Sequence, residues 1–258
     1  MERYQLLFNT AVLAGEITLE SGAEIYRVED TARRILSLTG FATAEVFATT
    51  TGLFVTLADP TDPDLAPVTQ VRRINSRSAN LHRIAMVNEV SRELCAGKIE
   101  PEEALQRLRQ IRKTPPYPLW VVNLGFLLST MGFAVIFGGG IVEVLISGIC
   151  CLDMEAAGLL TKRITSGFMD NVIRTIPIAF VAYLFGFFLP ALSVDIVIIS
   201  SIMPLVPGVA ITNAIRDTLQ GDYNAGLARC AEAFVCALAI AVGSVAGICL
   251  CTMLIGTL

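Results

Sequence analysis

Two carboxylates inside an apolar segment are the residues of this sequence best suited to chemistry. Asp153 and Glu155 lie within residues 141–160, a run long and apolar enough to cross a membrane. An ionisable side chain at membrane depth is costly and normally faces a bundle interior or a water-filled cavity. We therefore predict that Asp153 or Glu155 carries a proton in a coupled process, with a purely structural role as the alternative.

A second group interrupts a later apolar segment, residues 195–215. Pro204, Pro207 and Gly208 remove helical hydrogen bonds within it. In lipid, such a break is tolerated only where protein or a water-filled cavity satisfies the released carbonyls, and transporters place substrate sites at breaks of this kind. We predict a substrate-binding region made of the break and the polar residues that follow it, Asn213 and Arg216. A proline kink used only for packing is the alternative.

The third candidate is a polar run near the N-terminus, residues 20–30. Glu24 and Arg27 are three residues apart and can pair on one face of a helix. We predict a regulatory pocket or an interface there, although a capped helix with a salt-bridged surface would account for the same residues. His82, the single histidine, has no nucleophile motif around it and is predicted to be an ordinary surface residue.

Composition places these groups in a membrane protein. Residues of the AVILMFWYC set make up 54% of the chain, against roughly 45–50% in a typical soluble domain even with glycine counted. Charged residues make up only 16%, against about 25% normally. The net charge of -4 supplies no basic surface to meet phosphates, so we exclude a nucleic-acid partner.

Charge divides the chain at a proline-rich linker. Of the 42 charged residues, 29 precede residue 117. We therefore predict a cytoplasmic α+β domain over residues 1–116 and a transmembrane domain over residues 117–258, joined by the helix-breaking residues 113–118. The predicted fold class is an α-helical integral membrane protein with about five transmembrane helices and an N-terminal cytoplasmic α+β domain.

Residue periodicity predicts the elements of the first domain. Apolar residues at helical spacing predict one helix before Ser21, a second over residues 25–38, and two more over residues 80–94 and 101–111. Alternating stretches predict three strands, and proline with aspartate predicts a loop between the last two. The strands are expected at residues 44–47, 53–57 and 68–74, and the loop at residues 59–64.

Apolar length predicts five membrane spans, and the loops predict their orientation. The spans are residues 119–137, 141–160, 172–189, 195–215 and 227–254. All loop cations fall on one side, which the positive-inside rule makes cytoplasmic; they are Lys113, Lys162, Arg163, Arg174, Arg216 and Arg229. The N-terminus is then cytoplasmic and Leu258 lies outside. Gly243 and Gly247 form a small-xxx-small pattern that predicts a close contact between helices.

The remaining residue types favour neither a metal site nor an enzyme. The seven cysteines form no CxxC pair and there is one histidine, so we predict no metal and no cofactor. An intramembrane enzyme would need a nucleophile and base, or a metal, which these residues do not supply. A membrane-anchored sensor, whose cytoplasmic domain binds a ligand or a partner, stays open as the alternative to a transporter.

Several stretches resemble the threonine/serine exporter family. They are residues 19–31 (LESGAEIYRVEDT), Thr50-Thr51-Gly52, residues 80–92, and residues 204–222 with Pro204-Leu205-Val206-Pro207-Gly208, Asn213 and Arg216-Asp217. The likeness covers nearly the whole chain. It is closest to the split form of the family, in which one protein supplies the cytosolic domain and about five spans. At Thr50 the chain departs from the family, which often has a proline before the threonine.

The resemblance implies proton-driven export of a small polar metabolite. Threonine and serine are the named substrates, and relatives with the split architecture are tied to dicarboxylates such as succinate. It also implies a second, smaller membrane subunit that completes the transporter, and a location in the bacterial inner membrane. We expect an oligomeric assembly as well. The resemblance carries over no residue roles, so the site predictions above rest on the residues themselves.

Overall fold

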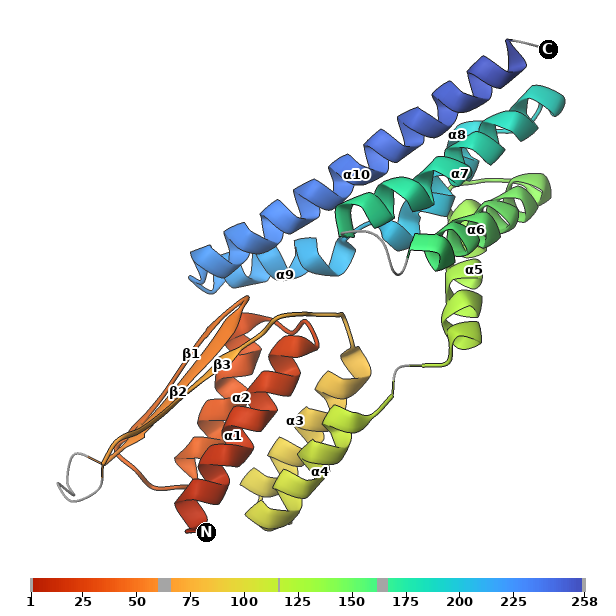
Figure 1. Ribbon diagram of the computed structural model, residues 1–258. Coiled ribbons are helices and arrows are strands. Elements are labelled where there is room, and N and C mark those ends of the chain that lie inside the picture. Colours follow the sequence, from red (N-terminus) through yellow and green to blue (C-terminus); the bar gives the residue numbers. More distant parts are fainter. Residues whose placement is uncertain (1, 60–65, 116, 162–166, 257–258) are drawn as a thin grey trace. The chain divides into compact units, whose positions relative to one another are not determined.

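The computed structural model describes residues 2–59, 66–115, 117–161 and 167–256 (Figure 1). The predictions that involve residues 60–64, Pro116, Lys162, Arg163 and Leu258 lie outside the described residues. The chain is mostly helical with one small sheet. It divides into two compact units. The first unit is Met1–Pro115 with Val209–Cys230, and the second is Pro116–Gly208 with Ala231–Leu258.

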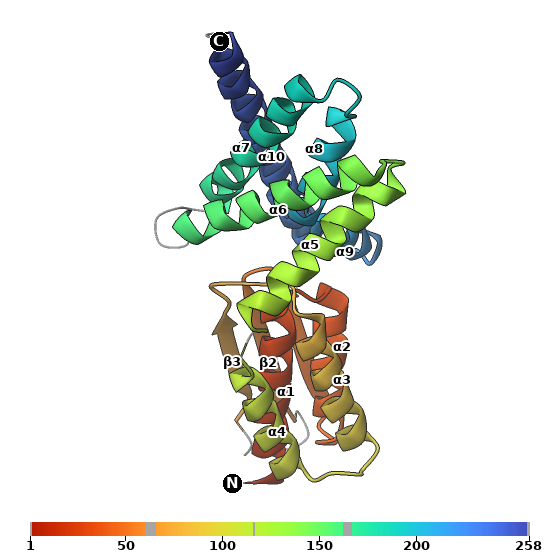
Figure 2. The same cartoon turned by 90° about the vertical axis from the view of Figure 1, so that its right-hand side faces the viewer.

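The first unit stacks helices on one small sheet. Helices α1 and α2 cover the sheet, and α3 and α4 pack against them from the other side (Figures 1 and 2). The elements are α1 (Arg3–Glu20), α2 (Ile25–Ser37), β1 (Thr43–Thr49), β2 (Gly52–Ala58), β3 (Val68–Arg73), α3 (Leu81–Cys95), α4 (Pro101–Lys113), α9 (Gly208–Leu219) and the start of α10 (Tyr223–Ile255).

The sheet is an antiparallel meander in the order β1-β2-β3. Val46 pairs with Val55, and both are buried against the helices together with Leu53 and Leu57. Gly15 of α1 allows this packing, since a Cβ there would lie 2.8 Å from Cδ2 of Leu53. The alternation of buried and exposed positions follows from the two-residue period of a strand.

The elements predicted for this region are present close to their predicted bounds. The three strands and the helices α2, α3 and α4 differ from the prediction by one or two residues at their ends. One element of the first unit was not predicted there. It is α9, which follows the second proline of the break and belongs to the first unit. The division into a domain of residues 1–116 and a domain of residues 117–258 stays a prediction.

The second unit is a helical bundle with an apolar exterior. It contains α5 (Leu119–Ile136), α6 (Ile141–Thr161), α7 (Gly167–Phe188), α8 (Val194–Ile202), the short 3-10 helix η1 (Met203–Leu205) and the rest of α10. A small core forms around Met154, Ile178 and Val197. Large apolar side chains such as Trp120, Ile141 and Phe234 are exposed. An exterior of this kind suits a lipid environment.

Three described helices are long and apolar enough to cross a membrane. They are α5, α7 and α10, and a fourth crossing is formed if α8–η1 and α9 count as one bent span. The bend between these two parts is 59°. The helix break predicted at residues 204–208 is therefore confirmed. The count of five spans stays a prediction.

Two element ends differ from the prediction for a physical reason. Helix α7 begins at Gly167, five residues before the predicted span, so Asp170 is helical as well as Arg174. Arg174 Nε lies 2.9 Å from Asp170 Oδ2, one helical turn away. Helix α10 begins at Tyr223, before the predicted span, and has 33 residues. Its first turns belong to the first unit, which accounts for the extra length.

The predicted close helix contact is present between α10 and α7. A Cβ at Gly243 would lie 2.5 Å from the carbonyl oxygen of Val172, and one at Gly247 would lie 2.3 Å from that of Ile176. Both distances are far inside van der Waals contact. Glycine at these two positions, one turn apart, lets the two backbones touch.

Replacing Gly247 by leucine should therefore destabilise the bundle. The side chain has no space against α7, and overpacking of this kind costs about 1–3 kcal/mol or more. The measurement is thermal unfolding of the purified chain in detergent. Gly125→Leu in α5 is the matched control, since a Cβ at Gly125 meets nothing within 4 Å. Equal shifts in both variants would contradict the packing described.

Candidate functional site

The site is built on the turn between α1 and α2. Gly22 adopts a φ of +78°, which lets its N–H donate to the carbonyl of Leu19 and ends α1. Glu24 is the N-cap residue of α2, but its side chain caps no backbone group. The first turn of a helix has N–H groups without intrahelical partners. One of them, the N–H of Ile25, is satisfied here from far along the chain.

Three side chains from α9 and α10 bind the backbone of this turn. Asn213 Nδ2 donates to the carbonyl oxygen of Gly22 at 2.9 Å, and Arg229 Nη2 donates to that of Ala23 at 2.6 Å. The N–H of Ile25 donates to Asp217 Oδ1 at 3.0 Å, so this carboxylate caps α2. We call this set of contacts the α9 junction. It joins two of the stretches that resemble the exporter family.

A buried ion pair holds the junction together. Arg229 Nε lies 2.9 Å from Asp217 Oδ2, and the two side chains are 5% and 0% exposed. Each charge is costly to bury alone, but the two neutralise each other, and both also bond to the turn. Breaking the pair would leave one charge uncompensated.

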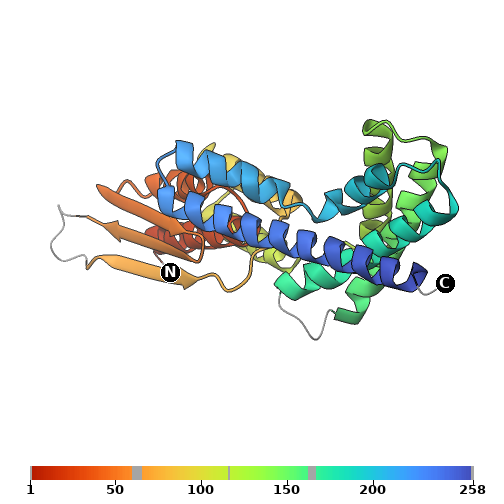
Figure 3. The same cartoon turned by 90° about the horizontal axis from the view of Figure 1, so that it is seen from above.

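The hairpin between α9 and α10 brings the two partners of this pair together. The helices lie side by side (Figure 3) and are joined by a tight turn in which Gly221 has a φ of +93°. Gly226 permits the close approach, because a Cβ there would lie 2.1 Å from Thr218 Oγ1. Arg229, one turn further along α10, thereby reaches Asp217.

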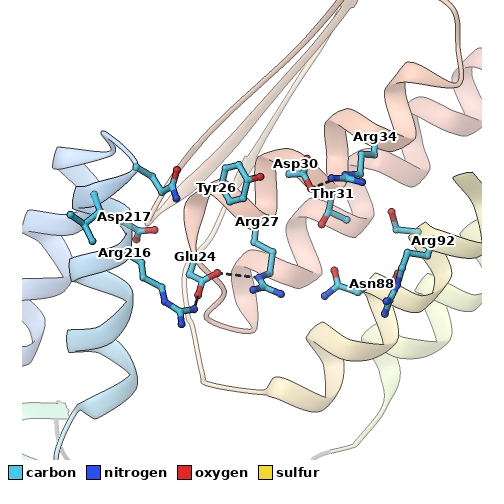
Figure 4. A pocket seen from close by; sticks show the side chains of 13 residues that line it. Glu24, Tyr26, Arg27, Asp30, Thr31, Arg34, Asn88, Arg92, Arg216 and Asp217 are labelled. Atoms are coloured by element: carbon cyan, nitrogen blue, oxygen red, sulfur yellow. Dashed lines mark hydrogen bonds and ion pairs between the residues drawn. The ribbon is translucent and has the colours of Figure 1, made fainter.

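Glu24 links α2 to α9 on the solvent side of the junction. Its carboxylate is paired with Arg27 at 3.0 Å and also with Arg216 of α9 (Figure 4). The predicted pair of Glu24 and Arg27 is therefore present. Burial on its own would raise the pKa of Glu24, but the hydrogen bonds from Arg216 and Arg27 outweigh it and hold the pKa below its ordinary value of 4.5.

This lowered pKa predicts a pH dependence of stability. A carboxyl group whose pKa is lowered by folding stabilises the fold above its ordinary pKa, and this contribution is lost as pH falls through the lowered value. We expect wild type to be more stable than Glu24→Gln by about 0.5–1 kcal/mol at pH 7, and the difference to be lost as the pH falls from 4.5 through the lowered pKa of Glu24. Chemical unfolding at a series of pH values measures it. A difference independent of pH would contradict the assignment.

The acidic residues of the second unit have different surroundings. Glu155 lies 3.5 Å from Arg174, which also pairs with Asp170, and the guanidinium of Arg174 occupies the space that a Cβ at Gly158 would need. Asp153 is half-buried, and within the described ranges its carboxylate forms neither an ion pair nor a hydrogen bond. Asp153 and Glu155, for which the sequence predicts the same role, thus have different surroundings in the structure.

The five predicted substrate-binding residues are divided between the units. Pro204, Pro207 and Gly208 belong to the second unit, at the end of η1 and the start of α9. Asn213 and Arg216 belong to the first unit, where both are engaged in the α9 junction. The roles of Asp153, Glu155 and these five residues stay predictions. Within the part of the chain that is described, no cluster of metal-ligating residues occurs.

Sequence reasoning missed the pairing of Asp217 with Arg229. From the sequence, Asp217 is named only within a stretch that resembles the exporter family, and Arg229 only as one of the loop cations. The signal that could have found the pair is an acid and a base on either side of one predicted hairpin turn, residues 217–229. Neither is solvated in the fold, so each needs the other.

The apolar bundle and its exposed apolar helices define an integral membrane protein with several spans. The family model ThrE, described as "Putative threonine/serine exporter", matches residues 9–251. The chain therefore belongs to the threonine/serine exporter family, and the resemblance found in the sequence is confirmed.

Known proteins of two lengths are similar to this chain. A "Probable threonine/serine exporter" of Mycobacterium tuberculosis is 21% identical over 92% of the chain and 45% of its own length. A "Probable succinate transporter subunit YjjP" of Klebsiella aerogenes is 29% identical over 88% of the chain and 87% of its own length. The Escherichia coli protein of the same name is 26% identical over 95% of the chain and 94% of its own. The chain thus spans about half the length of the first relative and nearly all of the other two. No solved structure matches it.

Proposed function

We propose that this chain is one subunit of an exporter that moves small carboxylate-bearing metabolites out of the bacterial cytoplasm. The family match over residues 9–251 carries the proposal. The relatives' names supply the substrate class, which is threonine and serine or a dicarboxylate such as succinate. Transport is the activity that these names describe, so we propose that the chain is not an enzyme.

A second, smaller membrane subunit completes the transporter in this proposal. The chain corresponds to about half of the Mycobacterium tuberculosis exporter but to nearly all of two proteins whose name contains the word subunit. The missing half is then a separate membrane protein. The two form an oligomeric assembly in the inner membrane.

The proposed topology has a cytoplasmic domain, residues 1–116, and five spans in residues 117–258. Helix α8 and η1 have nine and three residues, about 18 Å of helix, while the hydrocarbon core is about 30 Å thick. The break at Pro204–Gly208 would then lie at membrane depth. The N-terminus is cytoplasmic and the C-terminus is outside, as the loop cations favour.

The substrate-binding region is proposed at this break. Pro204 and Pro207 have no N–H to donate to the carbonyls one turn before them; of these, Met203 O accepts from Val206 N instead, and Gly208 N donates to Val206 O within the turn. The released carbonyls suit the ammonium of an amino acid, and the amides suit a carboxylate. Asn213 and Arg216 follow on α9, where the half-exposed Arg216 would attract the substrate's carboxylate from the cytoplasmic side.

Asp153 is the first candidate for the residue that couples export to proton movement. A group that carries a proton must exchange it, and Asp153 has no cationic partner among the described residues. Glu155, in contrast, already has a cationic partner, Arg174, which it shares with Asp170. Glu155 is therefore the second candidate, and its closest contact suits a positioning role.

Export assays in cells test the proposal. Release of threonine, serine and succinate is measured from cells that express the chain alone, and from cells that also express a small membrane protein that copurifies with it. We expect export of at least one of the three only when both proteins are present. If none is exported in either case, the exporter proposal fails and the sensor alternative becomes the better account.

A further inference from the structure

A charged pocket of about 600 Å³ lies beside the α9 junction, within the first unit. Its walls come from three helices: α2, α3 and α9 (Figure 4). Its size is within the range of pockets that bind small molecules. Neither the family match nor the relatives' names assign a role to it.

The pocket is richer in unused donors than in unused acceptors. Each of its three acidic residues already has a cationic partner: Glu24 has Arg27 and Arg216, Asp30 has Arg34, and Asp217 has Arg229. Arg92, in contrast, forms no ion pair within the described ranges. Its Nε donates to the backbone carbonyl of Asn88 at 3.2 Å.

Three of the pocket's arginines share one feature. Arg27, Arg34 and Arg92 use Nε for their hydrogen bonds to the protein, and among the residues that the structure describes their terminal nitrogens Nη1 and Nη2 make none. The terminal nitrogens of a guanidinium form the fork that binds carboxylate or phosphate in a bidentate manner. The pocket therefore offers three such forks to a ligand.

The spacing of these arginines sets the form of the ligand. Arg27 and Arg34 are seven residues apart on α2, which is two helical turns, or about 10 Å along the axis. Arg92 lies on α3, on another wall. A ligand that engages more than one of them has its negative charges on separate groups.

We propose that this pocket binds a small metabolite with two separate anionic groups, held by Arg27, Arg34 and Arg92. Arg216 and Asp217 line the same pocket, so the bound ligand also contacts α9. Binding stabilises the α9 junction, because it connects α2, α3 and α9. Dicarboxylates and diphosphates share the required chemistry, and the proposal does not depend on export.

Isothermal titration of the purified full chain tests the proposal. The probes are succinate and pyrophosphate, and acetate and inorganic phosphate are the corresponding single-group controls, all at one ionic strength. We expect one two-group probe to bind at least about tenfold tighter than its single-group control. The probe that binds identifies the ligand as a dicarboxylate or a diphosphate.

The variants are Arg92→Gln and Arg34→Gln, with Arg33→Gln as the matched control. Arg33 lies on α2 outside the pocket, with its side chain 51% exposed. We expect the first two to weaken binding at least about tenfold, the loss typical of one charge-assisted hydrogen bond, and the control to bind like wild type. Melting curves without ligand verify that each variant folds.

Two results would overturn the proposal. One is the absence of saturable binding of both two-group probes to wild type. The other is unchanged affinity in the two pocket variants. Binding is measured without transport, so a chain that binds but exports nothing would leave the pocket in place and remove only the exporter proposal.

Discussion

Arg229→Met should loosen the α9 junction within the first unit. The substitution leaves the carboxylate of Asp217, which is fully buried, without its cation. Removal of one partner of a buried pair costs about 3–5 kcal/mol. The hydrogen bond from Arg229 to the carbonyl of Ala23 is lost as well. We expect faster hydrogen exchange of the peptides that cover residues 21–30 and 213–219 of the full chain.

Two further variants separate the ion pair from a general loss of stability. Arg33→Met removes an exposed cation whose closest carboxylate oxygen, on Glu29, is 3.9 Å away, so its cost should be below about 1 kcal/mol. Asp217→Asn combined with Arg229→Met removes both charges and keeps a side-chain oxygen that can accept from Ile25. This double variant should exchange more slowly than Arg229→Met alone. Wild-type exchange in Arg229→Met would show that the pair does not hold the junction.

Asp153→Asn should abolish proton-driven export while the chain still folds. Asparagine has nearly the same shape but cannot carry a proton. Because Asp153 accepts no hydrogen bond within the described ranges, the substitution breaks no contact. Export driven by an imposed pH gradient should fall to the level of cells without the protein, while exchange of substrate across the membrane without a gradient continues.

The controls for this prediction come from the same unit. Asp195→Asn changes an exposed acid in the first turn of α8 and should leave coupling intact. Glu155→Gln removes one of the two partners of Arg174 and should mainly lower thermal stability. If Asp153→Asn retains gradient-driven export at the wild-type rate, Asp153 is not the coupling group.

Local patterns in the sequence were sufficient for much of the fold. The strands follow from alternation, and their register brings Phe47 opposite Phe54 as the short turn before Gly52 requires. The pair of Glu24 and Arg27 follows from their spacing on a helix. The break at Pro204 and Pro207 follows from their missing N–H groups.

The α9 junction could not be predicted in this way. Asn213 contacts Gly22 across 191 positions of sequence, and Arg229 contacts Ala23 across 206. Periodicity shows which face of a helix is apolar, but not which distant turn that face meets. The apolar character of residues 195–215 also favours one membrane span, whereas residues 209–215 belong to the first unit.

The different surroundings of Asp153 and Glu155 could not be predicted from the sequence either. Both are acids two positions apart in one apolar helix. Residues two apart on a helix point to different sides, and only the fold shows that the side of Glu155 meets Arg174 of α7.

Flux through liposomes that contain the purified chain and its copurifying membrane partner tests the exporter proposal most directly. Labelled succinate, threonine or serine is enclosed, and its release is followed with and without an acidic exterior. The account predicts release of at least one of them only with both proteins, and faster release when the exterior is acidic. Retention of all three solutes with both proteins present would contradict it.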